Sequence, residues 1–238
     1  MKQLYIFILS LLLCSCADRP SSKPLPNEKA EVNLDENSTT LVVLGTIQDA
    51  GSPHIACQRE CCRALFLDTS IDRRVVSLGL VDNPYNKKYL FEATPNITRQ
   101  LKTLVQASTK NRNEIVDGIF LTHAHIGHYI GLMYLGKEAT NAKNVPVFAM
   151  PKMRNFLSTN GPWDQLVSNN NIQLQTIENE RAVVLTPNVT VTPFLVPHRD
   201  EYSETVGYKI QGPSKSALFI PDIDKWERWG RNIDSLVA

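Results

Sequence analysis

Leu121-Thr122-His123-Ala124-His125-Ile126-Gly127-His128 carries three of the five histidines in this chain of 238 residues. The octapeptide ends an apolar run, 115–121, that is typical of a strand, and it opens a helical pattern. Neutral imidazole is the commonest zinc ligand in proteins. His123 and His125 are two residues apart and can present the same side, while His128 can turn back from the first helical turn. The sequence therefore predicts a metal site where this strand ends.

Two further metal-ligand types follow apolar runs later in the chain. His198 comes after the run 189–196 and Pro197, and Asp222 comes after the run 217–220. Each of them alone is more often an ordinary loop residue. Together with the histidine octapeptide they place imidazoles and a carboxylate at the ends of separate strands, which predicts that they converge on one cation.

The expected elements alternate between apolar strand patterns and a few amphipathic helices. Helices are expected at 97–107, from 128 to 135, and over 151–167 with an interruption at Gly161-Pro162. Strands are expected at 41–46, 74–81, 88–93, 115–121, 145–150, 172–177, 182–185, 189–196, 205–210 and 217–220. Many strands with few helices predict an α+β domain of stacked sheets covered by helices.

These motifs resemble those of the metallo-β-lactamase superfamily. THAHIGH is similar to its His-x-His-x-Asp-His signature, and PHRDEYSETVGYKI followed by ALFIPD is similar to its tRNase Z-like and phosphonate-pathway phosphodiesterase branches. LGTIQDAGSPHIACQRECC and FEATPN look closest to the branch named after PQQ-biosynthesis protein B. The resemblance covers about residues 41–238 and implies an αββα four-layer sandwich.

The resemblance also implies roles for particular residues. His123, His125 and His198 would form a complete first metal site, whereas His128 and Asp222 are what is left of a second one. Asp222 would bridge the two metals, orient the attacking water and act as its base. Asp200 and Glu201, just after His198, are candidates for contact with the ligands from outside the metal site and for proton donation. Asp49 and Gly51 are expected to border the site.

Gly127 departs from the family pattern, because the family usually has a metal-binding Asp at this place. On that basis Gly127→Asp is expected to strengthen the second site. The chain is also expected to be C-terminally incomplete, or naturally truncated, because no histidine follows His198 and family members continue to a last His ligand.

These observations predict a metal-dependent hydrolase that uses a metal-activated water on a small ester or phosphodiester at the cell envelope. Zn²⁺ is the expected metal, and iron stays open because three histidines leave coordination positions free. Two alternatives stay open as well: an iron-dependent oxidative enzyme like PQQ-biosynthesis protein B, and a non-catalytic carrier of a small molecule. The formal net charge of +1 offers no electrostatic basis for nucleic acid binding.

Three cysteines, Cys57, Cys61 and Cys62, lie in the loop after the first expected strand. Their odd number argues against a disulfide framework. Thiolates are good zinc ligands, and related branches carry a cysteine cluster here that holds a structural metal. The alternative is that one or two of them are buried free thiols.

The N-terminus predicts export. Residues 1–16 resemble a bacterial lipoprotein signal with Cys16 as the lipidated residue, because Cys14 would place the bulky Leu13 before the cleavage site. An ordinary signal peptide with an incidental cysteine is the alternative. Residues 17–40 read as a flexible tether, and 41–238 as the folded domain. The expected protein is a membrane-anchored lipoprotein of the cell envelope that binds a small-molecule substrate.

Overall fold

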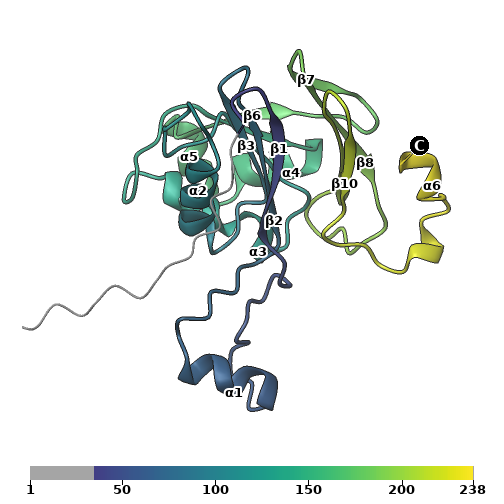
Figure 1. The fold of residues 1–238 in the computed structure, drawn as a ribbon. Helices are drawn as coiled ribbons and strands as arrows, with labels where there is room; N and C mark the ends of the chain where they lie inside the picture. The colour runs from purple at the N-terminus through teal and green to yellow at the C-terminus, as the bar shows by residue number, and fades with distance from the viewer. Residues whose placement is uncertain (1–34, 238) are drawn as a thin grey trace, which may run out of the picture. The chain divides into compact units, whose positions relative to one another are not determined.

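The computed structural model describes residues 35–237, so the predicted signal peptide, Cys16 and most of the tether lie outside the described residues. Two sheets with helices packed on them make up this part of the chain (Figure 1), which confirms the expected α+β class. Between residues 35 and 237, no helix is long and apolar enough to cross a membrane.

The first sheet has six strands in the order β1-β2-β3-β4-β5-β6. The first three strands pair antiparallel, and β3 to β6 pair parallel. Parallel neighbours need a crossover, and helices provide it here. The strands are β1 (Thr39–Gly45), β2 (Ser77–Asp82), β3 (Lys87–Phe91), β4 (Gly118–Phe120), β5 (Val145–Ala149) and β6 (Ile172–Thr176).

The second sheet is antiparallel and has four strands in the order β10-β9-β8-β7. Its strands are β7 (Val183–Thr186), β8 (Val189–Leu195), β9 (Val206–Gln211) and β10 (Ser216–Phe219). Both β8 and β10 pair antiparallel with β9. The two therefore run in the same direction, and their carboxyl ends reach the same edge of the sheet.

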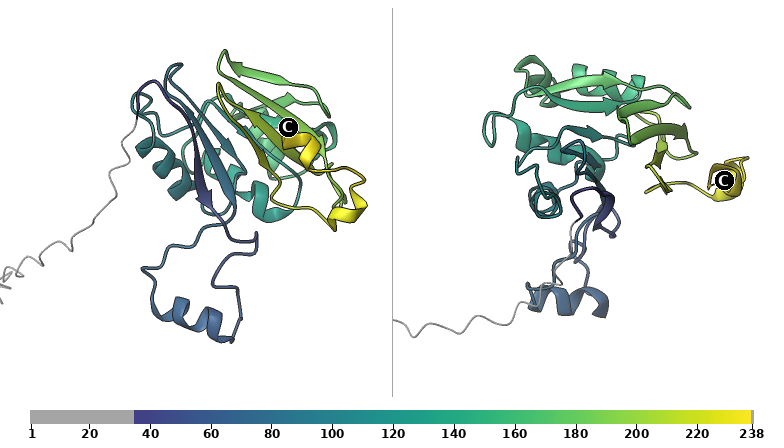
Figure 2. Two further views of the ribbon diagram at one scale, coloured as in Figure 1. Left: turned by 45° about the vertical axis from the view of Figure 1, so that its right-hand side comes forward. Right: turned by 45° about the horizontal axis from the view of Figure 1, so that its top comes forward.

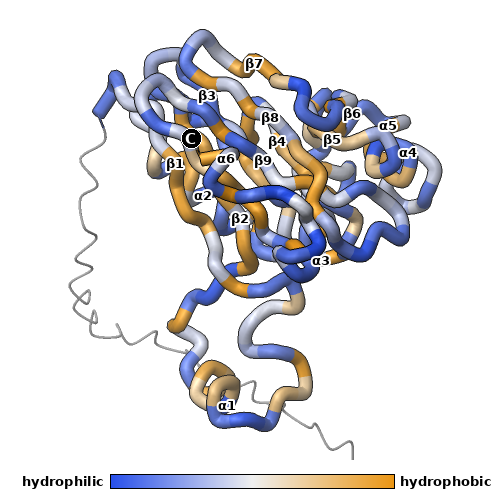
Figure 3. The backbone as a smooth tube through the Cα atoms, turned by 90° about the vertical axis from the view of Figure 1, so that its right-hand side faces the viewer, coloured by the Kyte–Doolittle hydropathy of each residue, from blue (hydrophilic) through white to orange (hydrophobic). Residues whose placement is uncertain are grey.

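Two buried clusters separate the layers. One lies between the six-stranded sheet and its helices and includes Leu90, Ile119, Leu104 and Leu157. The other lies between the two sheets, where Phe120 stacks on Phe148 with ring centroids 4.3 Å apart and further side chains from both sheets complete it. Figure 3 shows hydrophobic residues following the strands. Both sides of the central sheet are thus buried, which explains the near-continuous apolar runs in its parallel strands.

The helices that cover the six-stranded sheet follow its strands in sequence, and two turned views show them on its outer side (Figure 2). They are α2 (Ile97–Gln106), α3 (Ile126–Tyr129), the 3-10 helix η1 (Ile130–Leu135), α4 (Pro151–Thr159) and α5 (Trp163–Ser168). The break between α4 and α5 falls at Gly161-Pro162, as the sequence predicts. The helix expected from His128 begins two residues earlier, and it changes to 3-10 geometry at Ile130.

Three short helices differ from the sequence-based expectation. The loop that holds the cysteines contains α1 (Glu60–Leu67), which lies apart from the sheets in Figures 1 and 2. After Asp222 the chain forms a short 3-10 turn, η2 (Trp226–Arg228), and then α6 (Asp234–Val237). Trp229 fixes this segment to the second sheet, because its indole N–H donates to the Leu195 carbonyl at 2.8 Å.

Candidate metal centre

Strand ends from both sheets meet where the ligand candidates lie. His123 and His125 follow β4, His198 follows β8, and Asp222 follows β10. Two backbone contacts hold these loops together: the Ala124 N–H donates to Ser203 Oγ at 2.8 Å, and the Val206 N–H donates to the Thr122 carbonyl at 3.2 Å.

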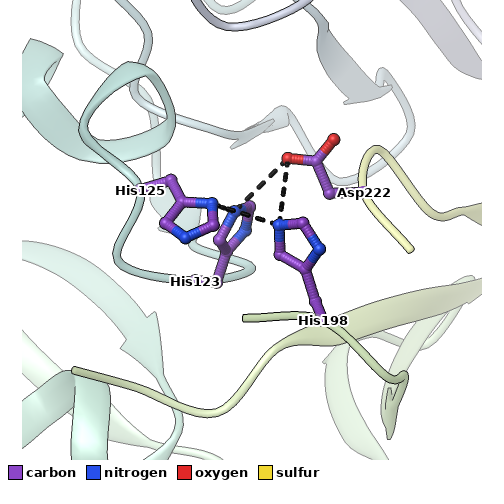
Figure 4. A group of neighbouring side chains, drawn as sticks. All are labelled: His123, His125, His198 and Asp222. Atoms are coloured by element: carbon purple, nitrogen blue, oxygen red, sulfur yellow. Dashed lines mark hydrogen bonds and ion pairs between the residues drawn. The ribbon is translucent and has the colours of Figure 1, made fainter. Parts of the chain in front are cut away.

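Three imidazole nitrogens and one carboxylate oxygen face one another in this cluster (Figure 4). His125 Nδ1 lies 2.9 Å from His123 Nε2 and 3.1 Å from His198 Nε2. Asp222 Oδ2 lies 3.3 Å from His123 Nε2 and 3.9 Å from His198 Nε2. Zinc bonds of about 2.0–2.1 Å in tetrahedral geometry separate neighbouring ligand atoms by about 3.3 Å. The spacing of these four donors fits such a cation.

Each of the three histidines is also fixed through its other ring nitrogen. His123 Nδ1 lies 2.9 Å from Thr122 Oγ1, His125 Nε2 lies 3.2 Å from Glu201 Oε2, and His198 Nδ1 lies 3.2 Å from Asp224 Oδ1. A partner on the far nitrogen determines the tautomer and leaves the near nitrogen free to bind a metal. The arrangement is that of a metal site with its supporting contacts already made.

His128 lies beside this cluster and is fully buried. Its Nδ1 is 2.7 Å from Glu92 Oε2, and its Nε2 is 3.0 Å from Asp222 Oδ2. The second approach lacks the angles of a hydrogen bond, so Nε2 is a buried polar atom without a hydrogen-bond partner. A buried nitrogen without a hydrogen-bond partner, next to a carboxylate, is typical of a cation site.

The charges around the cluster shift three pKa values. Burial lowers the pKa of His123, which keeps its ring neutral and able to bind metal. Burial alone would also lower the pKa of His128, but the Glu92 charge and the contacts with Asp222 outweigh it and raise that pKa to about 10. The close approach of the His123 and His128 rings holds the pKa of Asp222 well below its usual range, so this carboxylate stays ionised.

The expected neighbours of the ligands fall in different places. Glu201 contacts His125, whereas the Asp200 carboxylate accepts a hydrogen bond from Thr205 at 2.9 Å. Asp49 lines a hollow of about 470 Å³ that also borders His125. Larger hollows of about 610 and 690 Å³ lie elsewhere on the described residues, but neither includes a ligand candidate. Of these three hollows, the smaller one is the one that a histidine of the cluster lines.

The structure gives a steric argument against the expectation for Gly127→Asp. A Cβ on Gly127 would lie 2.6 Å from both the Cβ and the carbonyl oxygen of Asp49. Real Cβ atoms do not approach other atoms so closely, so a side chain at this position would push the loop after β1 away. Gly127 is thus required by the packing of Asp49 against the helix that carries His128.

Sequence reasoning missed Glu92, Thr122 and Asp224 as partners of the histidines. Glu92 is the informative case, because it is a fully buried carboxylate directly after the apolar end of β3, with a backbone φ of 76°. Its other oxygen accepts the Thr122 N–H at 3.0 Å. A charged residue at the end of a buried strand was the available signal.

The three cysteines of the α1 segment also come together, with their Sγ atoms within 4.8 Å of one another. Cys62 is buried and Cys61 is exposed. A hydrogen bond with the Cys62 thiol lowers the pKa of Cys57, which favours the thiolate that binds metal. Among the described residues, this is the second group of side chains whose donor types suit a metal ion.

Comparison with known proteins gives one family and several related folds. The family described as "Beta-lactamase superfamily domain" matches residues 87–237. A search of curated proteins finds no match to this chain. Zn²⁺-bound PqqB from Methylobacterium extorquens shares 23% sequence identity at a TM-score of 0.63, over 80% of this chain and 68% of PqqB.

Two other solved structures match less well. A diphosphatase of the PhnP family has 23% identity and a TM-score of 0.49, over 72% of this chain and 61% of its own. The metallo-β-lactamase fold protein YhfI from Bacillus subtilis has 12% identity and the same TM-score, over 76% and 61%. This chain thus spans between six and seven tenths of the length of these three proteins. The match to PqqB, with its TM-score of 0.63, shows that the two proteins share a fold.

Proposed function

The chain belongs to the beta-lactamase superfamily, and from this membership we propose that it is a metal-dependent hydrolase of a small phosphodiester or ester. One observation carries the proposal. Three imidazole nitrogens and the Asp222 carboxylate face one point, and each of the three rings is held through its other nitrogen. This donor set suits Zn²⁺. Because four protein donors complete a tetrahedron, a water would enter as a fifth ligand beside Asp222.

A cation bound by these residues would lower the pKa of its water toward about 7 and polarise a phosphoryl or carbonyl oxygen. Asp222 can hold that water through a hydrogen bond, because its carboxylate stays ionised. Because its pKa is so low, Asp222 is a weak base. We therefore assign it the roles of metal ligand and orienting group for the water, and not that of general base. Glu201 keeps His125 in the orientation that points Nδ1 at the centre.

The hollow beside His125 is where a substrate would bind. Its volume of about 470 Å³ suits a small molecule. Phe156 and Tyr202 form an aromatic wall with ring centroids 5.5 Å apart, and Arg199 contributes a positive charge close to His125. A cationic side chain next to a metal favours an anionic substrate, so a phosphodiester fits this hollow better than a neutral ester.

We propose that this chemistry takes place at the cell envelope, on a protein anchored through lipidated Cys16. The support is the sequence of residues 1–16 alone, with its apolar core and its Leu13-Cys14-Ser15-Cys16 end.

The test is turnover and metal content of the purified protein. Zinc-loaded protein should hydrolyse bis(p-nitrophenyl) phosphate faster than p-nitrophenyl acetate. His123→Ala, His125→Ala and His198→Ala should each weaken binding of the principal metal by at least about 100-fold, because water replaces a fixed ligand. His54→Ala is the matched control, since His54 is exposed and its side chain hydrogen-bonds to the Ile55 carbonyl, away from the cluster.

Three outcomes would count against the proposal. Full metal content in any of the three ligand variants would reject the assigned site. Bound zinc without turnover of either substrate would favour the carrier. Bound iron with consumption of oxygen would favour an oxidative enzyme.

A further inference from the structure

We propose that Asp49, from the loop after β1, supplies a carboxylate to a second cation position beside His128 and Asp222. The proposal deepens the proposed function, and it rests on that function only in taking the histidine cluster to bind metal. Asp49 would then provide, from a distant part of the sequence, the carboxylate ligand that residue 127 cannot provide because it is glycine.

The first observation is an incomplete set of donors. His128 Nε2 is buried, has no hydrogen-bond partner, and lies 3.0 Å from Asp222 Oδ2. Glu92 Oε2 lies 2.7 Å from the other ring nitrogen, Nδ1. This contact fixes the ring so that Nε2 is directed toward Asp222. One imidazole and one shared carboxylate are too few protein ligands for a tightly bound cation, which usually has three or more.

The second observation is the position of Asp49. Its Cβ lies 2.6 Å from the place where a Cβ on Gly127 would be, next to His128 in the sequence. The Asp49 side chain thus begins almost where a side chain on residue 127 would begin. It is half-buried, and it lines the same hollow as His125. Rotation about its side-chain bonds changes the direction of the carboxylate without moving the backbone.

Charge supports the same assignment. A second divalent cation next to a protonatable, buried His128 needs negative charge close by, because buried charges are costly unless they are compensated. Glu92 is already engaged by Thr122 and His128, and Asp222 is shared with the first site. Asp49 adds a carboxylate that has no hydrogen bond from another side chain among the described residues.

The experiment measures bound zinc per chain by elemental mass spectrometry after equilibration with the metal alone. Wild-type protein should bind about two ions at its histidine centre, and Asp49→Asn should bind about one, because an amide is a weak zinc ligand. The cysteine cluster is replaced by serine in the reference protein and in every variant, so that only ions at the histidine centre are counted. Asp164→Asn, in the first turn of α5, is the matched control and should keep both ions.

A reciprocal exchange sharpens the test. Gly127→Asp alone should not gain metal, because its side chain collides with Asp49. The double variant Asp49→Gly, Gly127→Asp removes the collision and moves the carboxylate from residue 49 to residue 127. It should therefore bind the second ion that Asp49→Asn loses. Such a recovery is non-additive and is not expected if Asp49 acts only through packing.

Two ions in Asp49→Asn, or a single ion at the centre of the wild-type protein, would overturn the proposal. The Asp49→Asn result decides the matter even if Gly127→Asp fails to fold. Failure of the proposed function looks different: both ions bind in the wild-type protein and depend on Asp49, yet neither substrate is hydrolysed.

Discussion

Each histidine of the centre has one nitrogen directed at the other donors and one held by the protein. The holding partners are of different kinds: the Thr122 hydroxyl and the carboxylates of Glu92, Glu201 and Asp224. Glu92 is the only one of the three carboxylates that is fully buried together with its histidine. It therefore has the strongest influence on the protonation of the ring it contacts.

Glu92→Gln should lower the pKa of His128 in the metal-free protein from about 10 toward its ordinary value of 6.5. The reason is that the glutamine removes the negative charge that outweighs the effect of burial. The measurement is an NMR titration of the histidine ring signals, with exposed His54 as the internal reference. Glu114→Gln is the control, because that carboxylate is exposed and pairs with Lys102. An unchanged His128 titration would show that Asp222 alone determines the shift.

At the scale of elements, the chain builds its centre from loops that follow strands. The α1 segment is the exception, because it leaves the sheets and has little apolar burial of its own. Ile55, Phe66 and Leu67 are all more than half exposed there. A short helix with so little packing is marginal in water. A metal held by the three thiols would contribute the missing stability.

Replacing Cys57, Cys61 and Cys62 together by serine should lower the melting temperature of the zinc-loaded protein, by at least about 5 °C. Metal at the histidine centre should stay, because those ligands come from other elements. Calorimetry and metal content measure the two effects separately. An unchanged melting temperature would favour the alternative of free thiols.

At the scale of the whole molecule, a polar link connects the two sheets away from the centre. Asp82 at the end of β2 is fully buried and accepts hydrogen bonds from Thr39, at 2.9 Å, and from Thr186 of β7. Asn188 donates to the same carboxylate at 3.3 Å. The link fixes the second sheet against the first, and the centre needs strand ends from both.

Asp82→Ala should reduce the free energy of unfolding by about 2–4 kcal/mol, because several donors lose a charged acceptor and some stay buried without a partner. Urea denaturation checks this value. Glu36→Ala is the comparison and should change stability by less than about 0.5 kcal/mol, since its ion pair with Lys110 is exposed. Equal stability of the two variants would mean that the link contributes nothing.

The export of the whole chain stays a prediction from residues 1–16. Cys16→Ser should prevent lipidation and release the protein from the membrane fraction, while Cys14→Ser should not, because Leu13 makes Cys14 a poor cleavage site. Labelling with a fatty acid analogue and fractionation measure this. Continued membrane association of the Cys16 variant would refute anchoring through a lipidated Cys16.

Local patterns in the sequence were enough to find the strands, most helices and the ligand types at strand ends. Apolar runs of strand length bounded by glycine, proline and polar residues report burial on both faces of a sheet, and that is a local property. The histidine octapeptide, His198 and Asp222 could be selected because each follows such a run. Helix α1 could not be selected, since its residues pack on little else and leave only a weak apolar pattern.

Contacts between distant segments could not be read in this way. His198 meets Asp222 because β8 and β10 flank β9 and end at one edge, an arrangement set by strand pairing. Glu92 meets His128 because β3 and β4 are parallel neighbours. Asp49 meets Gly127 because the loop after β1 packs on α3, and this contact argues against the expectation for Gly127→Asp. Sequence periodicity reports which side of an element is buried, whereas the identity of the atoms facing that side depends on how the elements pack together.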